Sequence, residues 1–86
     1  MHSIDEVKRE DVRRLLSAYS DAIGKVFAGR REIVLQWKTR KDYKVHGHCL
    51  DRMLKSLGFV FMTHRKGEIQ IAYSEVRHGL LHIFTP

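Results

Sequence analysis

The apolar residues in the first third of the chain recur at helical spacing. Residues 3–6, Ser-Ile-Asp-Glu, match a capping box, so we expect a helix to begin there. Gly29 stands where a left-handed residue would end this long N-terminal helix. Its apolar arc consists of Val12, Leu15, Leu16, Tyr19, Ala22, Ile23, Val26 and Phe27. Its polar side holds two oppositely charged pairs four residues apart, Glu10 with Arg14 and Asp21 with Lys25.

The apolar positions that follow alternate, which is typical of strands. Ile33, Leu35 and Trp37 share one parity, and their branched and aromatic side chains predict a short strand with Trp37 in the core. A hairpin is expected next, because two apolar runs flank a turn that contains a glycine. Its parts are the strands 59–64 and 69–73 and the turn 65–67. A last apolar run, 80–84, predicts a final short strand.

A second amphipathic helix is predicted just before the hairpin. It ends at Gly58, and Asp42 is a candidate N-cap at its upstream end. Its apolar stripe consists of Cys49, Leu50, Met53, Leu54 and Leu57, and its opposite side holds Lys44, His48, Arg52 and Lys55. Asp51 is the one acid there, and it stands four residues before Lys55, so an ordinary surface ion pair is expected. His46 falls on the apolar arc, which favours a core histidine over a ligand.

Length and charge narrow the class of protein. Eighty-six residues form one domain, 1–86, too small for a large enclosed active site. The net charge is +6, and residues 30–66 alone hold ten basic against three acidic residues, so the middle of the chain attracts a polyanion such as nucleic acid. A solvated basic face without a ligand is the alternative. The single cysteine, the acidic N-terminal segment and the lack of a long apolar run predict a cytoplasmic protein with no membrane partner.

The order of elements resembles the winged-helix family of DNA-binding domains. A helix, a strand, a basic helix that ends in Leu57-Gly58-Phe59 and a hairpin cover residues 1–74. The resemblance implies that the second helix is the recognition helix, and that the hairpin tip is the wing, formed by His64, Arg65 and Lys66. The family has a further helix before the recognition helix, for which only residues 38–45 are available. An abbreviated helix-turn-helix is one alternative, and an α+β sandwich with two helices covering a small antiparallel sheet is the other.

Catalytic and metal chemistry find little support in the sequence. His46, His48 and Cys49 form one metal-like cluster and His78 with His82 another, but the ligand pattern of a zinc site is incomplete. Cys49 lies on the predicted apolar stripe, which argues for a buried side chain rather than a nucleophile. There is no phosphate-binding glycine loop and no paired-carboxylate motif. The sequence therefore predicts no enzyme, no metal and no cofactor.

The resulting prediction is a small α+β, winged-helix-like domain that binds duplex DNA, as a transcriptional regulator or a chromatin-type protein. The recognition helix would enter the major groove, and the hairpin tip would contact phosphates or the minor groove. The candidate nucleic-acid-binding residues are Lys38, Arg40, Lys41, Lys44, His48, Arg52, Lys55, Arg65 and Lys66.

Three alternatives stay open for the partner. Trp37 and Tyr43 interleave with basic residues, as in modules that bind single-stranded DNA or RNA by stacking. A non-catalytic accessory subunit that docks on a larger nucleic-acid enzyme, such as a polymerase, is the second. A homodimer is the third, and either this dimer or the larger protein partner would use the long apolar arc of the first helix.

Overall fold

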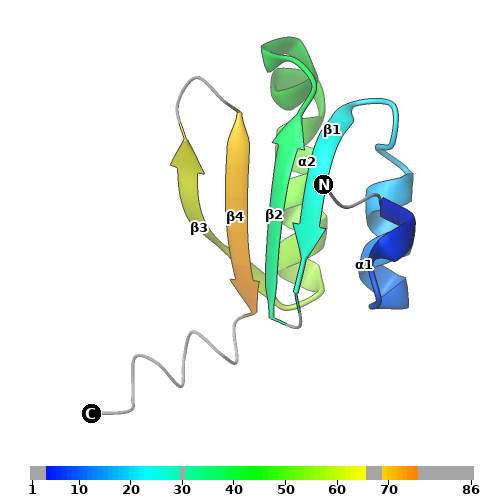
Figure 1. The fold of residues 1–86 in the computed structure, drawn as a ribbon. Helices are drawn as coiled ribbons and strands as arrows, with labels where there is room; N and C mark the ends of the chain where they lie inside the picture. Colours follow the sequence, from blue (N-terminus) through cyan, green and yellow to red (C-terminus); the bar gives the residue numbers. More distant parts are fainter. Residues whose placement is uncertain (1–3, 30, 66–68, 76–86) are drawn as a thin grey trace.

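The fold is a four-stranded antiparallel sheet with two α-helices beside it (Figure 1). The computed structural model describes residues 4–29, 31–65 and 69–75. In chain order the elements are a 3-10 turn (Ile4–Glu6), α1 (Glu10–Ser17), β1 (Ile23–Ala28), β2 (Glu32–Trp37), α2 (Arg40–Ser56), β3 (Phe59–Arg65) and β4 (Gln70–Glu75). The strand order is β1-β2-β4-β3, and α2 lies across the far face of the sheet in Figure 1. The predicted α+β class is confirmed.

One face of the sheet is buried, and the alternation along β2 shows which one. Ile33, Leu35 and Trp37 are each about 1% exposed, so the predicted strand and the core position of Trp37 are confirmed. Their partners in the neighbouring strands are buried too: Ile23 and Val26 in β1, and Ile71 and Tyr73 in β4. The helices cover this face with Val12 and Leu16 from α1 and Leu50 and Leu54 from α2. The predicted hairpin is also present, as β3 and β4.

The long N-terminal helix is wrong in its extent at both ends. α1 begins at Glu10 rather than at residues 3–6, where only a short 3-10 turn forms, and it ends at Ser17, while residues 23–28 form β1. A β-bulge at Gly24 explains the misleading pattern. Ile23 pairs with Trp37, and the register then shifts before Lys25 pairs with Gln36. The shift places Ile23 and Val26, three residues apart, on the same buried face, which is the spacing of a helix. Of the two predicted ion pairs, Glu10–Arg14 is present at 2.7 Å, whereas Lys25 lies in the strand.

The second helix is longer than the apolar stripe indicates. Thr39, not Asp42, is its N-cap: the Thr39 hydroxyl accepts a hydrogen bond from the Asp42 amide at 3.1 Å and donates one to the Asp42 carboxylate at 2.8 Å. α2 therefore begins three residues after β2 ends, and no separate helix stands between them. Two helices and a small antiparallel sheet match the second fold alternative, and the winged-helix resemblance stays a prediction.

Some expectations fall outside the described residues. They are the Ser3 cap, the turn residues Lys66 and Gly67, the histidine pair His78 and His82, and the final strand 80–84. Within the described ranges, no helix is both long enough and apolar enough to cross a membrane.

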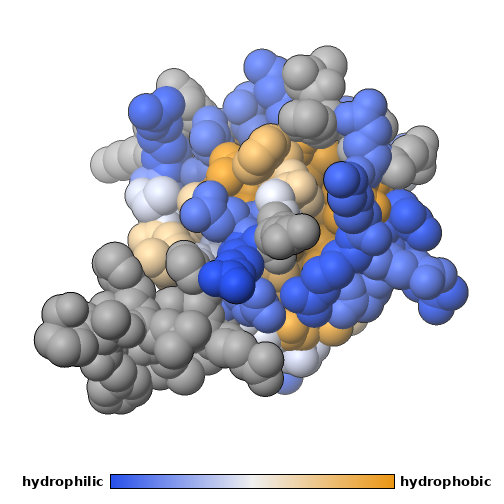
Figure 2. Space-filling view, turned by 60° about the horizontal axis from the view of Figure 1, so that its bottom comes forward, coloured by the Kyte–Doolittle hydropathy of each residue, from blue (hydrophilic) through white to orange (hydrophobic). Residues whose placement is uncertain are grey.

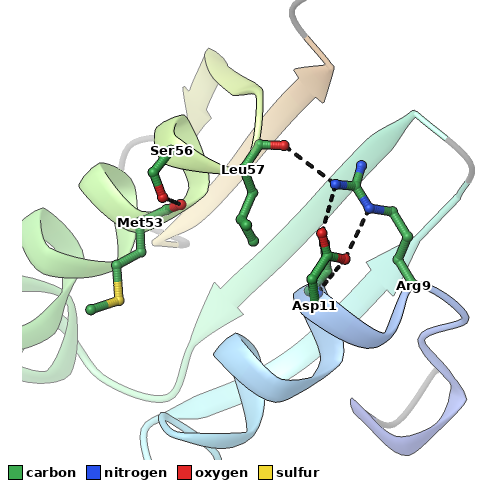
Figure 3. Close-up of polar contacts among 6 residues, drawn as sticks. Arg9, Asp11, Met53, Ser56 and Leu57 are labelled. Carbon is green, nitrogen blue, oxygen red and sulfur yellow. Dashed lines mark hydrogen bonds and ion pairs between the residues drawn. The ribbon is translucent and has the colours of Figure 1, made fainter.

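The junction between α2 and β3 is fixed by a glycine and an arginine. Gly58 has a φ of 95°, and its amide donates to the Lys55 carbonyl at 3.0 Å, which ends the helix. Arg9, just before α1, donates to the Leu57 carbonyl at 3.3 Å and to both oxygens of Asp11 (Figure 3). Its guanidinium also lies 5.0 Å from the centre of the Phe59 ring. Arg9 thus connects the start of α1 to the end of α2.

The left-handed conformation of Gly58 generates a stability prediction. Gly58→Ala is expected to lower the free energy of unfolding by about 1 kcal/mol, because a Cβ atom is disfavoured at this φ. Gly29→Ala is the matched control: contrary to the sequence expectation, Gly29 is not left-handed, and its Cβ would meet no atom closer than 3.7 Å. Urea denaturation measures both variants. Equal destabilisation of the two would contradict the role given to Gly58.

Candidate nucleic-acid interface

The side of α2 that faces away from the sheet is basic. Its buried positions are Gly47, Leu50 and Leu54, so the opposite side is open to solvent. The predicted residues of this helix are all exposed, and some of them border the hairpin: Arg40, Lys41, Lys44, His48, Arg52 and Lys55. Lys38 is exposed in the connection just before the helix. The structure therefore brings seven of the nine predicted residues onto α2 and its N-terminal connection.

The buried side of α2 differs from the predicted stripe. Cys49 is exposed and Met53 is 48% exposed, so neither belongs to the core. The expectation of a buried Cys49 is wrong, because the side of α2 that packs on the sheet includes Tyr43, His46 and Gly47. Cys49 lies outside this packed side. Residues that looked polar or helix-breaking in the sequence thus help to define the packed face.

His46 packs against aromatic rings, as expected for a core-facing histidine. Its ring stacks on Trp37 at 6.2 Å and meets the Tyr19 ring at 5.5 Å. Trp37 is buried, and its Nε1 has no hydrogen-bond partner. Trp37 is consequently closed to a nucleic-acid base. Of the two aromatics considered for single-strand stacking, only the half-buried Tyr43 remains partly accessible.

Basic residues also gather at one end of the sheet, the upper end in Figure 1, where the N-terminus of α2 lies. Lys25, Gln36, Gln70 and Arg65 form one row across all four strands. We call the following set the basic end: Lys25, Lys38, Arg40, Lys41, Lys44 and Arg65. Lys25 was missed because the sequence pattern placed it in a helix opposite Asp21. To place Lys25 at this end of the sheet, one would have had to know of the bulge in β1.

The hairpin tip lies beside the N-terminal half of α2. The His64 ring of β3 stacks on the Tyr43 ring of α2 with centres 5.2 Å apart and planes 24° apart. Arg65, the next residue, lies at the same end of the sheet, but it points to the opposite face, in the row with Gln70, Gln36 and Lys25. Lys66, the remaining predicted residue, lies outside the described part of the chain.

The acidic residue on this side of α2 is neutralised internally. Asp51 pairs with Lys55 at 2.9 Å, which confirms the predicted ion pair, and its carboxylate acts electrostatically on the Tyr73 hydroxyl. Burial and the Asp51 charge raise the pKa of Tyr73 above its ordinary value. Lys41, Lys44 and Arg52 have no acidic partner among the described residues. Most of the positive charge on α2 is therefore uncompensated.

A groove separates α2 from the β3–β4 hairpin. Its volume is about 460 Å³. It is lined by Tyr43, Lys44, Gly47, His48, Asp51, Lys55, Phe61, Ile71 and Tyr73. Gly47 stands where the Tyr43 ring crosses the helix, since a Cβ atom there would lie 2.8 Å from the Tyr43 Cδ1.

The other face of the sheet is not covered by any described element (Figure 1). Next to the row that joins Lys25 to Arg65, a less polar row runs through Phe27, Val34, Ala72 and Thr63. With the lower end of the sheet turned forward, apolar surface occupies the middle of the view and hydrophilic surface surrounds it (Figure 2). Apolar surface is thus present away from the basic end.

Neither a metal site nor a similarity to known proteins assigns a function to this surface. In the part of the chain that the structure describes, no group of three or more His, Cys, Asp or Glu residues is placed to hold a metal ion. Comparisons with known proteins found no matching family model, no matching curated protein and no matching solved structure. Any function must therefore be argued from the surface itself.

The raised pKa of Tyr73 predicts a pH dependence of stability. The unfolded chain loses this proton near pH 10, whereas the folded protein keeps it, so stability is intact below pH 10 and falls above it. Tyr73→Phe should remove this contribution and make the fall shallower, by up to about 1.4 kcal/mol per pH unit. Denaturation of both proteins between pH 8 and pH 11 measures it. If the stabilities of the two proteins fell in parallel above pH 10, the pKa of Tyr73 would not be raised by burial.

Proposed function

We propose that the protein binds nucleic acid, and duplex DNA in particular, through the exposed side of α2 and the adjoining basic end. The supporting observation is the difference between the two helices. Arg9 and Arg14 at α1 are paired with Asp11 and Glu10, whereas Lys41, Lys44 and Arg52 on α2 have no acidic partner among the described residues. Unpaired cations on one exposed side attract phosphates and release the counterions of the duplex on binding.

The dimensions of α2 suit a duplex. Lys41 and Arg52 are eleven residues apart, so they lie on the same side of the helix and about 16 Å apart along its axis. That distance exceeds the roughly 12 Å width of the major groove, so the two cations reach phosphates on its two sides. Lys44 and His48 lie between them along the axis of the helix and contact phosphates on the hairpin side. Arg65 lies at the same end of the sheet and contacts a neighbouring phosphate.

The other partners predicted from the sequence fare differently. The apolar arc that motivated a homodimer is divided between α1 and β1, and Val12, Leu16, Ile23 and Val26 from it are buried in the core. The homodimer stays a prediction, but the apolar arc no longer supports it. Docking of a larger enzyme on the first helix loses the same support, because the same residues are buried. Docking itself stays a prediction, and the uncovered face of the sheet is the surface that remains for it.

Matched charge variants test the proposed function. Lys41→Ala/Arg52→Ala is expected to weaken binding to a labelled duplex at least about tenfold at low salt, and to reduce the salt slope by about 2, because each of the two cations neutralises one phosphate. Fluorescence anisotropy at several salt concentrations measures both quantities. The control, Lys8→Ala/Arg14→Ala, removes the same net charge from exposed positions near α1 and should change binding little.

Three results would argue against the proposal. Equally weakened binding in both double variants would mean that only net charge matters. Unchanged binding by the Lys41/Arg52 variant would remove α2 from the interface and favour docking on a protein. Tighter binding of single-stranded DNA or RNA in the same titration would move the interface away from the major groove.

A further inference from the structure

The groove between α2 and the β3–β4 hairpin has an aromatic wall that duplex binding by α2 does not use. Its volume of about 460 Å³ lies within the range of small-molecule sites, roughly 300–1,000 Å³. It opens to solvent along α2, next to the basic side of the helix. The groove can therefore admit a small ligand without any rearrangement of the core.

The hairpin side of the groove is aromatic and apolar. Phe61 is 48% exposed, and its ring meets the buried Tyr73 ring edge-on, with centres 6.3 Å apart. Ile71 lies beside them in the lining. Tyr73 is held in place by its burial in the core. This wall offers a half-exposed ring, on a rigid base, to a flat unsaturated ligand.

The helix side of the groove is cationic. Lys44 and His48 are exposed and have no acidic partner among the described residues, and Lys55 pairs with Asp51. A ligand that carries a negative charge is therefore favoured over a neutral one. Asp51 does not reverse this preference, because its charge is already matched by Lys55.

Gly47 adds no side chain to the helix wall of the groove and so leaves room for the Tyr43 ring. A glycine inside a helix costs up to about 1 kcal/mol relative to alanine, so its position calls for a local reason. Any Cβ atom at this position would collide with the Tyr43 ring, which in turn stacks on His64. The absent side chain lets Tyr43 lie flat against α2 instead of projecting across the opening.

From these contacts we infer that the groove binds a single nucleotide unit, with its base against Phe61 and its phosphate at Lys44 and His48. Two sources have this chemistry: a free mononucleotide, and an unpaired nucleotide of a nucleic-acid strand. The second source rests on the proposed function, because the strand would be held by the outer cations of α2. The first source does not depend on duplex binding at all.

The fluorescence of 2-aminopurine tests the inference, because stacking on an aromatic ring quenches it. Three probes are compared: the free 2-aminopurine mononucleotide, a duplex with one unpaired 2-aminopurine, and the same duplex with this base paired. Quenching of the unpaired base or of the free nucleotide, and not of the paired base, is expected. Quenching of the unpaired base alone identifies the strand as the source, and quenching of the free nucleotide identifies the mononucleotide.

Two pairs of variants locate the site. Phe61→Leu is expected to weaken the quenching interaction at least about tenfold, whereas Phe27→Leu, an equally exposed phenylalanine (47%) on the other face of the sheet, leaves it unchanged. Lys44→Gln should weaken it as well, and Lys8→Gln should not. The lysine variants change only exposed side chains, so their folding is not at issue.

The outcomes separate this inference from the proposed function. No quenching of either the free or the unpaired probe overturns the inference, even if anisotropy shows salt-dependent binding of the paired duplex. Equally weakened quenching in Phe61→Leu and Phe27→Leu also overturns it, because the base would then not lie in the groove. Quenching of the free nucleotide without any duplex binding supports the groove and contradicts the proposed function.

Discussion

The structure depends on the burial of one face of a four-stranded sheet under α2. Ile33, Leu35 and Trp37 of the central strand β2 and Leu50 and Leu54 of the helix are almost completely buried. Removal of this apolar surface from water is the main favourable contribution to folding in so small a domain. Because the packed side of α2 is narrow, most of the helix surface remains in contact with solvent.

This arrangement also determines where the charge lies. A helix whose packed side consists of Gly47, Leu50 and Leu54 can expose cations along the rest of its surface without disturbing the core. The antiparallel order of strands then places Lys25 and Arg65 at the same end of the sheet as the start of α2. Charges that are scattered along the sequence thus gather at one end of the molecule, with the cations of α2 on the helix side of the sheet and Lys25 and Arg65 on its uncovered side.

The sequence predicted those parts of the fold in which local pattern and tertiary packing agree. The strand through Trp37, the hairpin, the basic side of α2 and the Asp51–Lys55 pair all follow from spacing alone. β1 could not be predicted, because the bulge at Gly24 gives a strand the periodicity of a helix. The exposure of Cys49 depends on the direction in which α2 faces the sheet, and that direction is set by Tyr43, His46 and Gly47.

The central claim is that the cations of α2, and not those of α1, contact the nucleic acid. Amide chemical shifts of the isotope-labelled protein, recorded during titration with a short duplex at low salt, test it residue by residue. If the claim holds, the largest changes fall in residues 38–44, at His48 and Arg52, and at Arg65, with little change in α1. Changes that are concentrated in α1, or spread evenly over both helices, would contradict it.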